Sequence, residues 1–445
     1  MEITENIKKE SLDALEELID QPSYNQPAQP HAPWGEGIND ALKTVLAICD
    51  KLGFKTYKDP EGYYGYADIG EGDETFGIVC HVDVVPVDRD GWHTDPFKAV
   101  VKDGMIYGRG AQDDKGPTIA AIFAVKTLMD AGVKFNKKIR FIFETDEETL
   151  WRGMAQYNKK EAPITMGIAP DAEFPLIYAE KGLEQAYLVG PGTDELHLEL
   201  KNAFNIVPAE APYAGPKLAE VKQALDELGF EYKDEGDKII VLGKAVHAMK
   251  APEGTNAVLR LAMALDKVFP GIPALDFIGK CFKEDATGKN VLGDVVDEAS
   301  GHLTFNISSL EINDKESRMQ IDLRIPVTID HDALIKKLDD KAREYGLHYE
   351  KFDYVAPLYV PKDSELVKKL MKVYQDATGD MKSQPAVSGG ATLARTMHQC
   401  VAFGAMLPGT KDLMHQNDEA WSLNDFYKVM SIYADAIKAL CTNAK

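Results

Sequence analysis

The chain has 445 residues, and at about 150 residues per domain this length predicts two or three domains. Hydrophobic residues make up 44% and charged residues 27%, which is typical of a globular protein and excludes wholesale disorder. Lys and Arg together number 50 and Asp and Glu 72, so the formal net charge is -22. Because no basic patch offsets this charge in the sequence, we expect neither nucleic acid nor a membrane surface as a partner.

The sequence carries no recognisable targeting or membrane segment. Residues 1–11 lack the apolar stretch of a secretory signal, and the longest apolar runs, 45–49 and 119–125, are far shorter than the roughly 20 residues that cross a bilayer. The 5 cysteines are scattered and form no CxxC pair, which predicts buried free thiols and not disulfides. These features predict a cytoplasmic protein.

The first part of the chain alternates helical and strand-like patterns. Apolar residues recur at helical spacing over residues 7–19 and 37–52. The period then changes, because residues 75–80 and 139–143 are short β-rich runs typical of strands buried on both faces, and residues 116–131 between them predict a long helix. Strand, helix and strand at this spacing favour an α/β sheet with crossover connections.

After about residue 180 the predicted elements become shorter. Strands are expected at 183–189, 197–200, 238–242, 303–307 and 319–327, with helices at 218–228 and 256–268. A linker with prolines at 355–361 then leads to a helix at 365–377 and an apolar strand at 400–404. We therefore predict an α/β fold: a discontinuous domain over residues 1–180 and 356–445, with a mixed sheet flanked by helices, and an inserted α+β domain over residues 181–355.

Ionisable residues follow the first predicted strand. His81 and Asp83 come directly after it, and the carboxyl ends of strands in open α/β sheets are where ligands bind. We expect His81 to be exposed there, and Asp83 could hold its second ring nitrogen, as carboxylates do for metal-bound imidazoles. Alone, His81 is more readily interpreted as a structural histidine than as a metal ligand.

A glycine-rich loop, GRGAQDDKG, spans residues 108–116 and opens the helix that follows. Such loops often hold phosphate, but the adjacent carboxylates Asp113 and Asp114 would repel an anion and favour a cation. On this motif alone, a metal site and a helix cap remain equal alternatives.

An acidic run, ETDEE, follows the strand at 139–143. A charge run is usually a solvated turn, but this one lies at a strand end, where Glu147 and Glu148 could act as general base and metal ligand. Asp171 and His415 also follow apolar segments. Two histidines and several carboxylates at strand ends suit a borderline-soft divalent metal ion.

In order and spacing these motifs resemble the co-catalytic metallopeptidases that include aminoacylase, carboxypeptidase G and the bacterial dipeptidases. The resemblance covers nearly the whole chain and is nearest to the dipeptidase V branch (PepV-like, carnosinase-like), because of QDDKGP at 112–117, PDAEFP at 170–175 and the long insert. It implies that the discontinuous domain is catalytic and that the insert is a lid.

The resemblance also implies a site with two divalent metal ions, zinc first and manganese or cobalt as alternatives. The implied ligands are His81 and Asp171 for one ion, Glu148 and His415 for the other, with Asp113 and a water bridging both. Glu147 would be the general base, and Asp83 would orient His81. The peptide bond after Asp113 is implied to be cis.

Further residues are implied to contact the substrate. His247 is similar to a lid histidine that stabilises the tetrahedral intermediate, and Asn205 and Arg324 resemble residues that hold the substrate, Arg324 through its terminal carboxylate. Without the resemblance, His247 and Asn205 are turn residues and Arg324 is a charge at a strand edge.

The segment SGGAT at 388–392 resembles a glycine turn whose N–H groups bind the substrate carboxylate. The implied contacts come from Gly389, Gly390 and Thr392, although Ala391 stands where the family has a third glycine.

The resemblance implies a metal-dependent dipeptidase that releases the N-terminal amino acid of a dipeptide, by attack of the metal-bridging water with Glu147 as base. An N-acyl amino acid deacylase or desuccinylase of the same family is the alternative. A magnesium phosphohydrolase would not need His81 and His415, and a silent binding protein would not need Glu147. The enlarged insert favours a monomer over a dimer.

Overall fold

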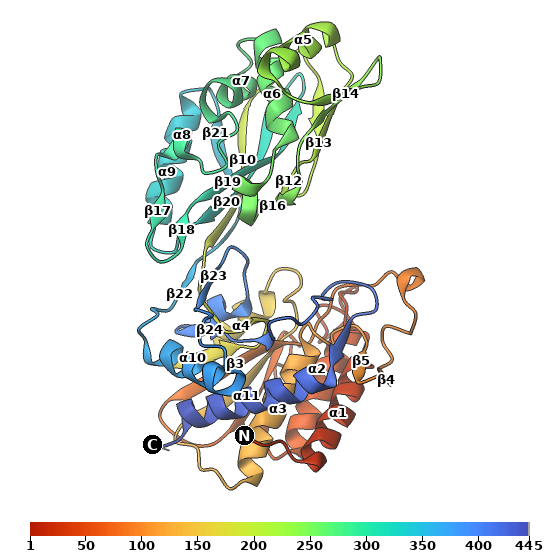
Figure 1. Ribbon diagram of the computed structural model, residues 1–445, viewed down its shortest axis with the longest axis vertical. Coiled ribbons are helices and arrows are strands. Elements are labelled where there is room, and N and C mark those ends of the chain that lie inside the picture. Colours follow the sequence, from red (N-terminus) through yellow and green to blue (C-terminus); the bar gives the residue numbers. More distant parts are fainter. Residues whose placement is uncertain (444–445) are drawn as a thin grey trace. The chain divides into compact units, whose positions relative to one another are not determined.

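The computed structural model describes residues 1–443, which divide into two compact units (Figure 1). Unit 1 comprises Met1–Tyr178, Tyr359–Ala386 and the residues from Thr392 onward. Unit 2 comprises Ala179–Leu358 and the short segment Val387–Ala391, which the sequence analysis had assigned to the catalytic domain. The function of unit 2 as a lid stays a prediction.

Unit 1 is built on a nine-stranded mixed sheet. Its main order is β1 (Lys55–Lys58), β2 (Tyr64–Ile69), β6 (Lys138–Glu144), β3 (Thr75–His81), β7 (Met166–Ala169), β24 (Cys400–Ala402), β9 (Ile177–Glu180) and β22 (Leu358–Tyr359), with β23 (Ala386–Ser388) paired to β9. β3 is parallel to β6 and β7, whereas β2 is antiparallel to both β1 and β6. The predicted α/β fold with a mixed sheet is therefore confirmed.

The helices of unit 1 pack around the buried strands at the centre of this sheet. They are α1 (Glu5–Ile19), α2 (Glu36–Lys51), α3 (Lys115–Asp130), α4 (Arg152–Lys160), α10 (Glu365–Thr378) and α11 (Leu423–Cys441). α3 contacts both α1 and α11, and most of its residues are buried (Figure 1). A helix that is apolar on nearly all sides belongs in a core, and α3 thereby fixes the loop that precedes it.

Short elements complete unit 1. These are the sheet of β4 (Val100–Lys102), β5 (Met105–Tyr107) and β26 (Ala420–Ser422), the pair β8 (Ala172–Glu173) and β25 (Ala405–Met406), and the 3-10 turns η1 (Arg89–Gly91) and η4 (Leu393–Thr396). Through β26, the residues that follow the loop 407–419 are tied to β5, which precedes the glycine-rich loop.

Unit 2 contains an antiparallel five-stranded sheet. Its order is β11 (Leu198–Leu200), β19 (Thr304–Ile312), β20 (Glu316–Ile325), β10 (Gly182–Pro191) and β21 (His348–Val355). Along β10 the buried residues Glu184, Ala186 and Leu188 alternate with half-buried ones, so one face of the sheet packs on the core. Helices and a second small sheet cover that face, as expected for an α+β unit.

The remaining elements of unit 2 are mostly short. The strands are β12 (Ile206–Val207), β13 (Glu210–Tyr213), β14 (Tyr232–Asp234), β15 (Ile239–Leu242), β16 (Val246–His247), β17 (Val296–Asp297) and β18 (Gly301–His302). The helices are α5 (Leu218–Leu228), α6 (Ala257–Val268), α7 (Pro273–Asp276), α8 (Lys289–Leu292) and α9 (His331–Arg343), with a 3-10 segment η2 (Ala248–Glu253) and a π-helix η3 (Phe277–Phe282). The sequence patterns do not predict α9, nor α4 and α11 in unit 1.

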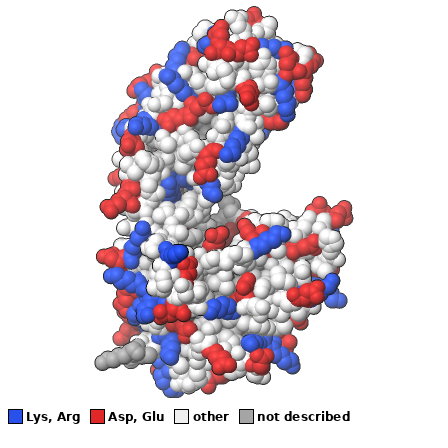
Figure 2. Space-filling model, viewed as in Figure 1, with Lys and Arg blue, Asp and Glu red and all other residues white. Residues whose placement is uncertain are grey.

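The surface and the thiols agree with the composition. All 5 cysteines are free and buried, as predicted. Acidic and basic side chains are interspersed over each unit on the face that Figure 2 shows, and the described residues there form no continuous basic patch. Among residues 1–443, no helix combines the length and apolarity that a membrane span requires.

Candidate metal centre

Side chains from separate segments meet at the carboxyl ends of the central strands of unit 1. β3 and β6 run parallel and end side by side, with His81 opposite Glu144. Asp171 follows β7, the other parallel neighbour of β3. Asp113 lies two residues before α3, and His415 lies in the loop between β25 and β26. The fold therefore brings together residues that are far apart in the sequence.

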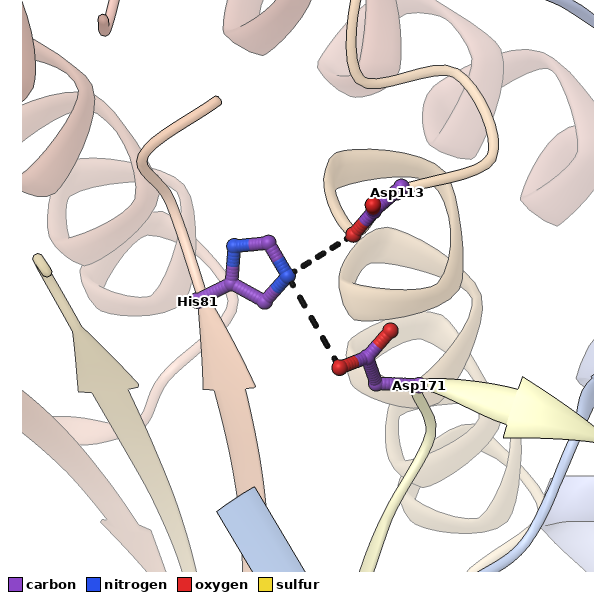
Figure 3. Close-up of side chains that lie close together, drawn as sticks. All are labelled: His81, Asp113 and Asp171. Carbon is purple, nitrogen blue, oxygen red and sulfur yellow. Dashed lines mark hydrogen bonds and ion pairs between the residues drawn. The ribbon is translucent and has the colours of Figure 1, made fainter. Parts of the chain in front are cut away.

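His81, Asp113 and Asp171 form the first group that could hold a metal ion. The Nε2 atom of His81 lies 2.9 Å from Oδ1 of Asp113 and 3.9 Å from Oδ2 of Asp171, so one ring nitrogen faces both carboxylates (Figure 3). His81 is fully buried and not exposed as expected, because its ring lies against Asp83 and Asp113. Its Nδ1 atom lies 2.9 Å from the main-chain oxygen of Asp83, which fixes the ring.

Asp113, Glu148 and His415 form the second group. The Nε2 atom of His415 lies 2.9 Å from Oδ2 of Asp113 and 3.2 Å from Oε2 of Glu148. Asp113 thus offers one carboxylate oxygen to each group. His415 has a φ of 60°, a left-handed conformation that is uncommon for a residue with a side chain, and its side chain is 54% exposed. The second group is therefore the more open one.

Crowded charges shift the ionisation of these side chains. Burial, together with the nearby carboxylates, raises the pKa of Glu147 well above its ordinary value. Burial also raises the pKa of Glu148. Hydrogen bonds to Asp113 and then to Glu148 raise the pKa of His415 to about 10. For Asp113, burial acts upward, but hydrogen bonds from His415 and His81 outweigh it and hold the pKa below its usual range.

The donor set fits divalent cations. Each group combines one imidazole nitrogen with two carboxylates, the mixture that zinc and similar ions accept. Within the described residues, the buried Oε1 atom of Glu148 and Oδ1 of Asp83 have no hydrogen-bond partner. Unsatisfied buried carboxylate oxygens are costly, so added positive charge would stabilise this site.

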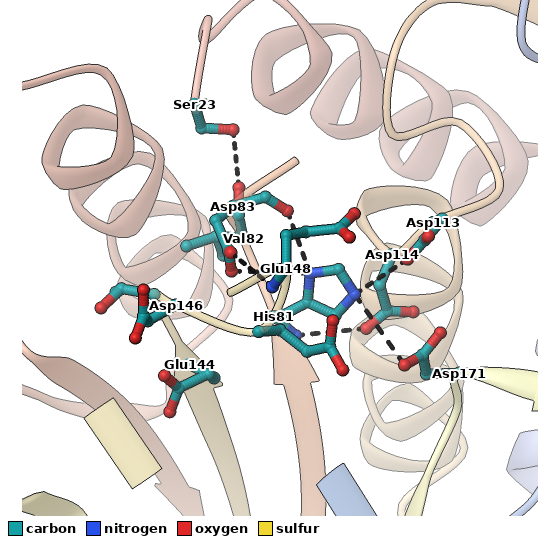
Figure 4. A network of polar contacts seen from close by, with 12 residues as sticks. Ser23, His81, Val82, Asp83, Asp113, Asp114, Glu144, Asp146, Glu148 and Asp171 are labelled. Atoms are coloured by element: carbon teal, nitrogen blue, oxygen red, sulfur yellow. Dashed lines mark hydrogen bonds and ion pairs between the residues drawn. The ribbon is translucent and has the colours of Figure 1, made fainter. Parts of the chain in front are cut away.

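Asp83 contacts both neighbouring loops (Figure 4). Its Oδ2 atom accepts a 3.0 Å hydrogen bond from the N–H of Glu148, while its Oδ1 lies 3.6 Å from Nδ1 of His81. The closer contact to that ring comes from the Asp83 carbonyl, so the main chain shares the orienting role that the resemblance gave to the carboxylate. Ser23 supports the same strand end, because its hydroxyl donates to the Val82 carbonyl at 2.6 Å.

The acidic run 144–148 is not a solvated turn. Glu144 and Asp146 are fully buried, and Asp146 accepts hydrogen bonds of 2.6 and 2.7 Å from Arg152. The indole of Trp151 donates to the Glu147 carbonyl at 2.8 Å, which holds the main chain beside the metal groups. The solvated alternative for this run is therefore wrong, since the loop folds back on α4.

The peptide bond between Asp113 and Asp114 is cis, as the resemblance implied. The carboxylate of Asp114 turns away from the two groups: its Oδ2 atom accepts from the N–H of His81 and from the hydroxyl of Thr118, each at 3.2 Å. Asp113 and Asp114 therefore have different functions, although the motif alone did not separate them.

Sequence reasoning missed Glu419, Arg109 and Gln112. Glu419 is fully buried and accepts hydrogen bonds from the glycine-rich loop, one of them a 2.7 Å contact with Arg109. The signal was present, because Glu419 stands only four residues after His415, but an acidic residue in a polar loop is usually solvated.

The residues predicted to bind substrate lie mainly in unit 2. Arg324 of β20 is buried and forms hydrogen bonds of 2.7 and 3.0 Å with Asp322, and its Nη1 atom donates to the Gly389 carbonyl at 2.7 Å. His247 is exposed at the end of β16, and burial of part of its ring, followed by the charge of Arg324, lowers its pKa. Asn205 is exposed in the loop before β12.

The glycine turn is divided between the two units. Gly389 and Gly390 belong to unit 2, and Thr392 belongs to unit 1. The N–H of Gly390 donates to the Ser388 hydroxyl at 2.9 Å, and the hydroxyl of Thr392 accepts from Ala394. The structure thus groups all five predicted metal ligands in unit 1, while their roles and those of the unit 2 residues stay predictions.

Comparison with known proteins agrees with this geometry. The chain is 38% identical over 440 residues to "Putative dipeptidase YtjP" of Bacillus subtilis (strain 168), covering 93% of each chain. Its fold is similar to that of the dipeptidase Dug1p from Saccharomyces cerevisiae, with a TM-score of 0.59, 16% identity and coverage of 98% and 96%. It is also similar to that of aminoacylhistidine dipeptidase from Vibrio alginolyticus, with a TM-score of 0.60, 13% identity and coverage of 97% and 96%.

The family model "Peptidase family M20/M25/M40" matches residues 77–439, a range that contains every predicted metal ligand. This match confirms the resemblance found in the sequence. The chain therefore belongs to the peptidase family M20/M25/M40 and is a metal-dependent peptidase.

Proposed function

We propose that the protein is a dipeptidase that binds two divalent metal ions, with zinc as the first candidate, and that it releases the N-terminal residue of its substrate. The observation that carries the proposal is the pair of histidine and carboxylate groups that share Asp113. One ion would be held by His81, Asp113 and Asp171, and the other by Asp113, Glu148 and His415. The printed name of the Bacillus subtilis relative supports dipeptides as the substrate class.

Divalent ions at these groups would polarise the scissile carbonyl and supply a nucleophilic water at neutral pH. Glu147 is the general base in this proposal. It belongs to neither group of candidate ligands among the described residues, so its carboxylate is free to accept a proton from water and return it to the leaving amine. Burial and the nearby carboxylates raise its pKa above that of an ordinary Glu, which makes it a stronger base.

Unit 2 would recognise the substrate as a lid. Asp322 and the Gly389 carbonyl take three of the five N–H donors of the Arg324 guanidinium, which leaves two for the terminal carboxylate of a peptide. His247, with its lowered pKa, would be neutral near pH 7 and could donate to the developing oxyanion. Asn205 would add a polar contact, and so would the Gly389–Gly390 turn, once the N–H of Gly390 exchanges the Ser388 hydroxyl for the substrate.

Small peptides as substrates, a monomeric state and a cytoplasmic location belong to the same proposal. The buried free thiols support the location, because reducing compartments keep cysteines in that form.

The proposal is tested by hydrolysis of dipeptides, tripeptides, N-acetyl amino acids and N-succinyl amino acids with metal-stripped protein reloaded with zinc or manganese. We expect metal-dependent cleavage that is fastest on dipeptides with free termini. Cleavage of only the acylated substrates would replace the dipeptidase by a deacylase or desuccinylase. No cleavage with either metal would contradict the proposal altogether.

A further inference from the structure

The loop that carries Asp113 is held by one buried carboxylate from the other end of the chain. The Oε1 atom of Glu419 accepts from the N–H of Gln112 at 2.7 Å and from the N–H of Asp113 at 3.2 Å. Its Oε2 atom accepts from the N–H of Gly110 at 3.1 Å and from Arg109 at 2.7 Å. Four donors from residues 109–113 therefore converge on a single side chain.

Gln112 makes the reciprocal contacts from the glycine-rich loop. Its Nε2 atom donates to the carbonyls of Lys411 and Ala420, at 3.0 and 2.9 Å, and its Oε1 atom accepts from the N–H of Leu413 at 2.9 Å. These residues flank His415 on both sides. Glu419 thus holds the Asp113 loop, and Gln112 holds the His415 loop.

Neither the loop of Asp113 nor the loop of His415 belongs to a helix or a sheet whose regular hydrogen bonds would fix it. Gly110 has a φ of 93°, which glycine adopts without strain. Glycine also makes the unfolded chain more flexible, so this loop loses more conformational freedom on folding. Besides the main-chain hydrogen bonds from Gly108 to Glu419 and from Arg109 to Pro96, the side chains of Glu419 and Gln112 tie the loop of Asp113 to the loop of His415, whose ligand atoms lie 2.9 Å apart.

A purely structural ion pair is the alternative explanation for Glu419 and Arg109. That explanation accounts for one of the four hydrogen bonds only, because the other three come from main-chain N–H groups, one of them on Asp113 itself. Glu419 is not among the candidate ligands in the described residues, so it acts on a cation only through the loop.

We propose that Glu419 and Gln112 are positioning residues that hold Asp113 and His415 at the separation needed to bind the second cation. The inference rests on the proposed two-ion site. It predicts an asymmetry: Gln112 touches the His415 side, so its loss affects the second group alone, whereas Glu419 fixes Asp113, which both groups share.

The test is calorimetric titration of metal-stripped, full-length protein with zinc, beside circular dichroism to verify folding. We expect Glu419→Gln to lower the affinity for both ions by about 10- to 100-fold, because the amide would present its own N–H groups to the N–H donors of the loop. Gln112→Ala should lower the affinity for one ion to a similar degree and leave the affinity for the other ion within about twofold of the wild-type value.

Asp68→Asn is the matched control, since Asp68 accepts two 2.7 Å hydrogen bonds from the buried Arg140, away from the metal groups. We expect this variant to lose thermal stability and to bind both ions as the wild type does. An equal loss of metal affinity in the control would overturn the proposal, because the effect would then reflect general destabilisation.

The outcomes separate this inference from the proposed function. Wild-type protein that binds two ions, with both variants folded and binding them equally well, would overturn the positioning role alone. Wild-type protein that binds fewer than two ions would overturn the two-ion site and, with it, this inference. If Glu419→Gln does not fold, the one-ion loss expected for Gln112→Ala decides the question.

Discussion

Both units crowd carboxylates together, but they relieve the repulsion differently. In unit 2, Asp266 of α6 shares a hydrogen bond with Asp276 of α7, and burial together with that contact raises the pKa of Asp266 to about 6. Lys280 lies 2.6 Å from Asp276, one helical turn away. In unit 1, Asp113 instead faces His81 and His415, from segments far apart in the chain.

The difference shows that crowding alone does not make a metal site. In unit 2 the contact between the two carboxylates and the neighbouring Lys280 relieve the repulsion, and the pair includes no imidazole. The unit 1 cluster places two ring nitrogens and several carboxylate oxygens within reach of two positions. Convergent donors from separate segments, and not acidity, distinguish the two regions.

The largest effect is expected from removing the proposed base in unit 1. Glu147→Gln should lower kcat for dipeptides by about 10²- to 10⁴-fold, because proton transfer contributes that much, while the amide keeps the shape of the site. Steady-state kinetics on zinc-loaded protein, beside its metal content by elemental analysis, would check this. Unchanged kcat at full metal content would assign the base elsewhere.

Removing the metal should destabilise unit 1. Ions present at about 100 times their Kd stabilise the folded state by roughly 2.7 kcal/mol per site, so chelation should lower Tm by several degrees. Differential scanning calorimetry with and without chelator measures the shift, and readdition of zinc should reverse it. Asp113→Asn should show little further response to chelator, because Asp113 is common to both groups. A full wild-type response in that variant would rule out a shared ligand.

Arg324 tests recognition by unit 2 separately from the metal groups. Arg324→Lys keeps the charge and can still pair with Asp322, but it loses the planar guanidinium that binds a carboxylate through two hydrogen bonds. We expect kcat/KM for a dipeptide to fall by about 10- to 100-fold, corresponding to roughly 1.4–2.7 kcal/mol. The matched dipeptide amide, which has no terminal carboxylate, should be affected much less. An equal fall on both substrates would place the effect elsewhere.

The smallest effect concerns the carboxylate pair of unit 2. The folded pKa of Asp266 is raised to about 6 from an ordinary value of 3.8, so its contribution to stability is complete below about pH 4 and is lost as pH rises through 6. Asp266→Asn mimics the protonated form. Since the side chain is partly exposed, we expect a gain of only about 1 kcal/mol at pH 8, and a smaller gain at pH 4.5.

Thermal unfolding of the wild type and of Asp266→Asn at these two pH values measures that difference. The sign is decisive: a Tm gain that is larger at pH 4.5 than at pH 8 would mean that protonation of Asp266 does not relieve the repulsion in the pair.

The sequence predicted the candidate metal ligands better than the residues that hold the ligands in place. Ligands at strand ends could be predicted, because parallel strands bring their carboxyl ends to one edge, and His81 and Asp171 follow β3 and β7 directly. The partner of Arg109 could not, since Glu419 lies 310 residues away and only the folded chain selects it among many carboxylates. The burial of Glu144 likewise depends on contact with α4, and no local pattern predicts it.

The account is tested most directly by anomalous X-ray diffraction from crystals of the zinc-loaded protein, measured on both sides of the zinc absorption edge. It predicts two anomalous peaks, each about 2.0–2.2 Å from a different oxygen of Asp113, with His81 beside one and His415 beside the other. A single peak, or two peaks that do not share Asp113, would contradict it.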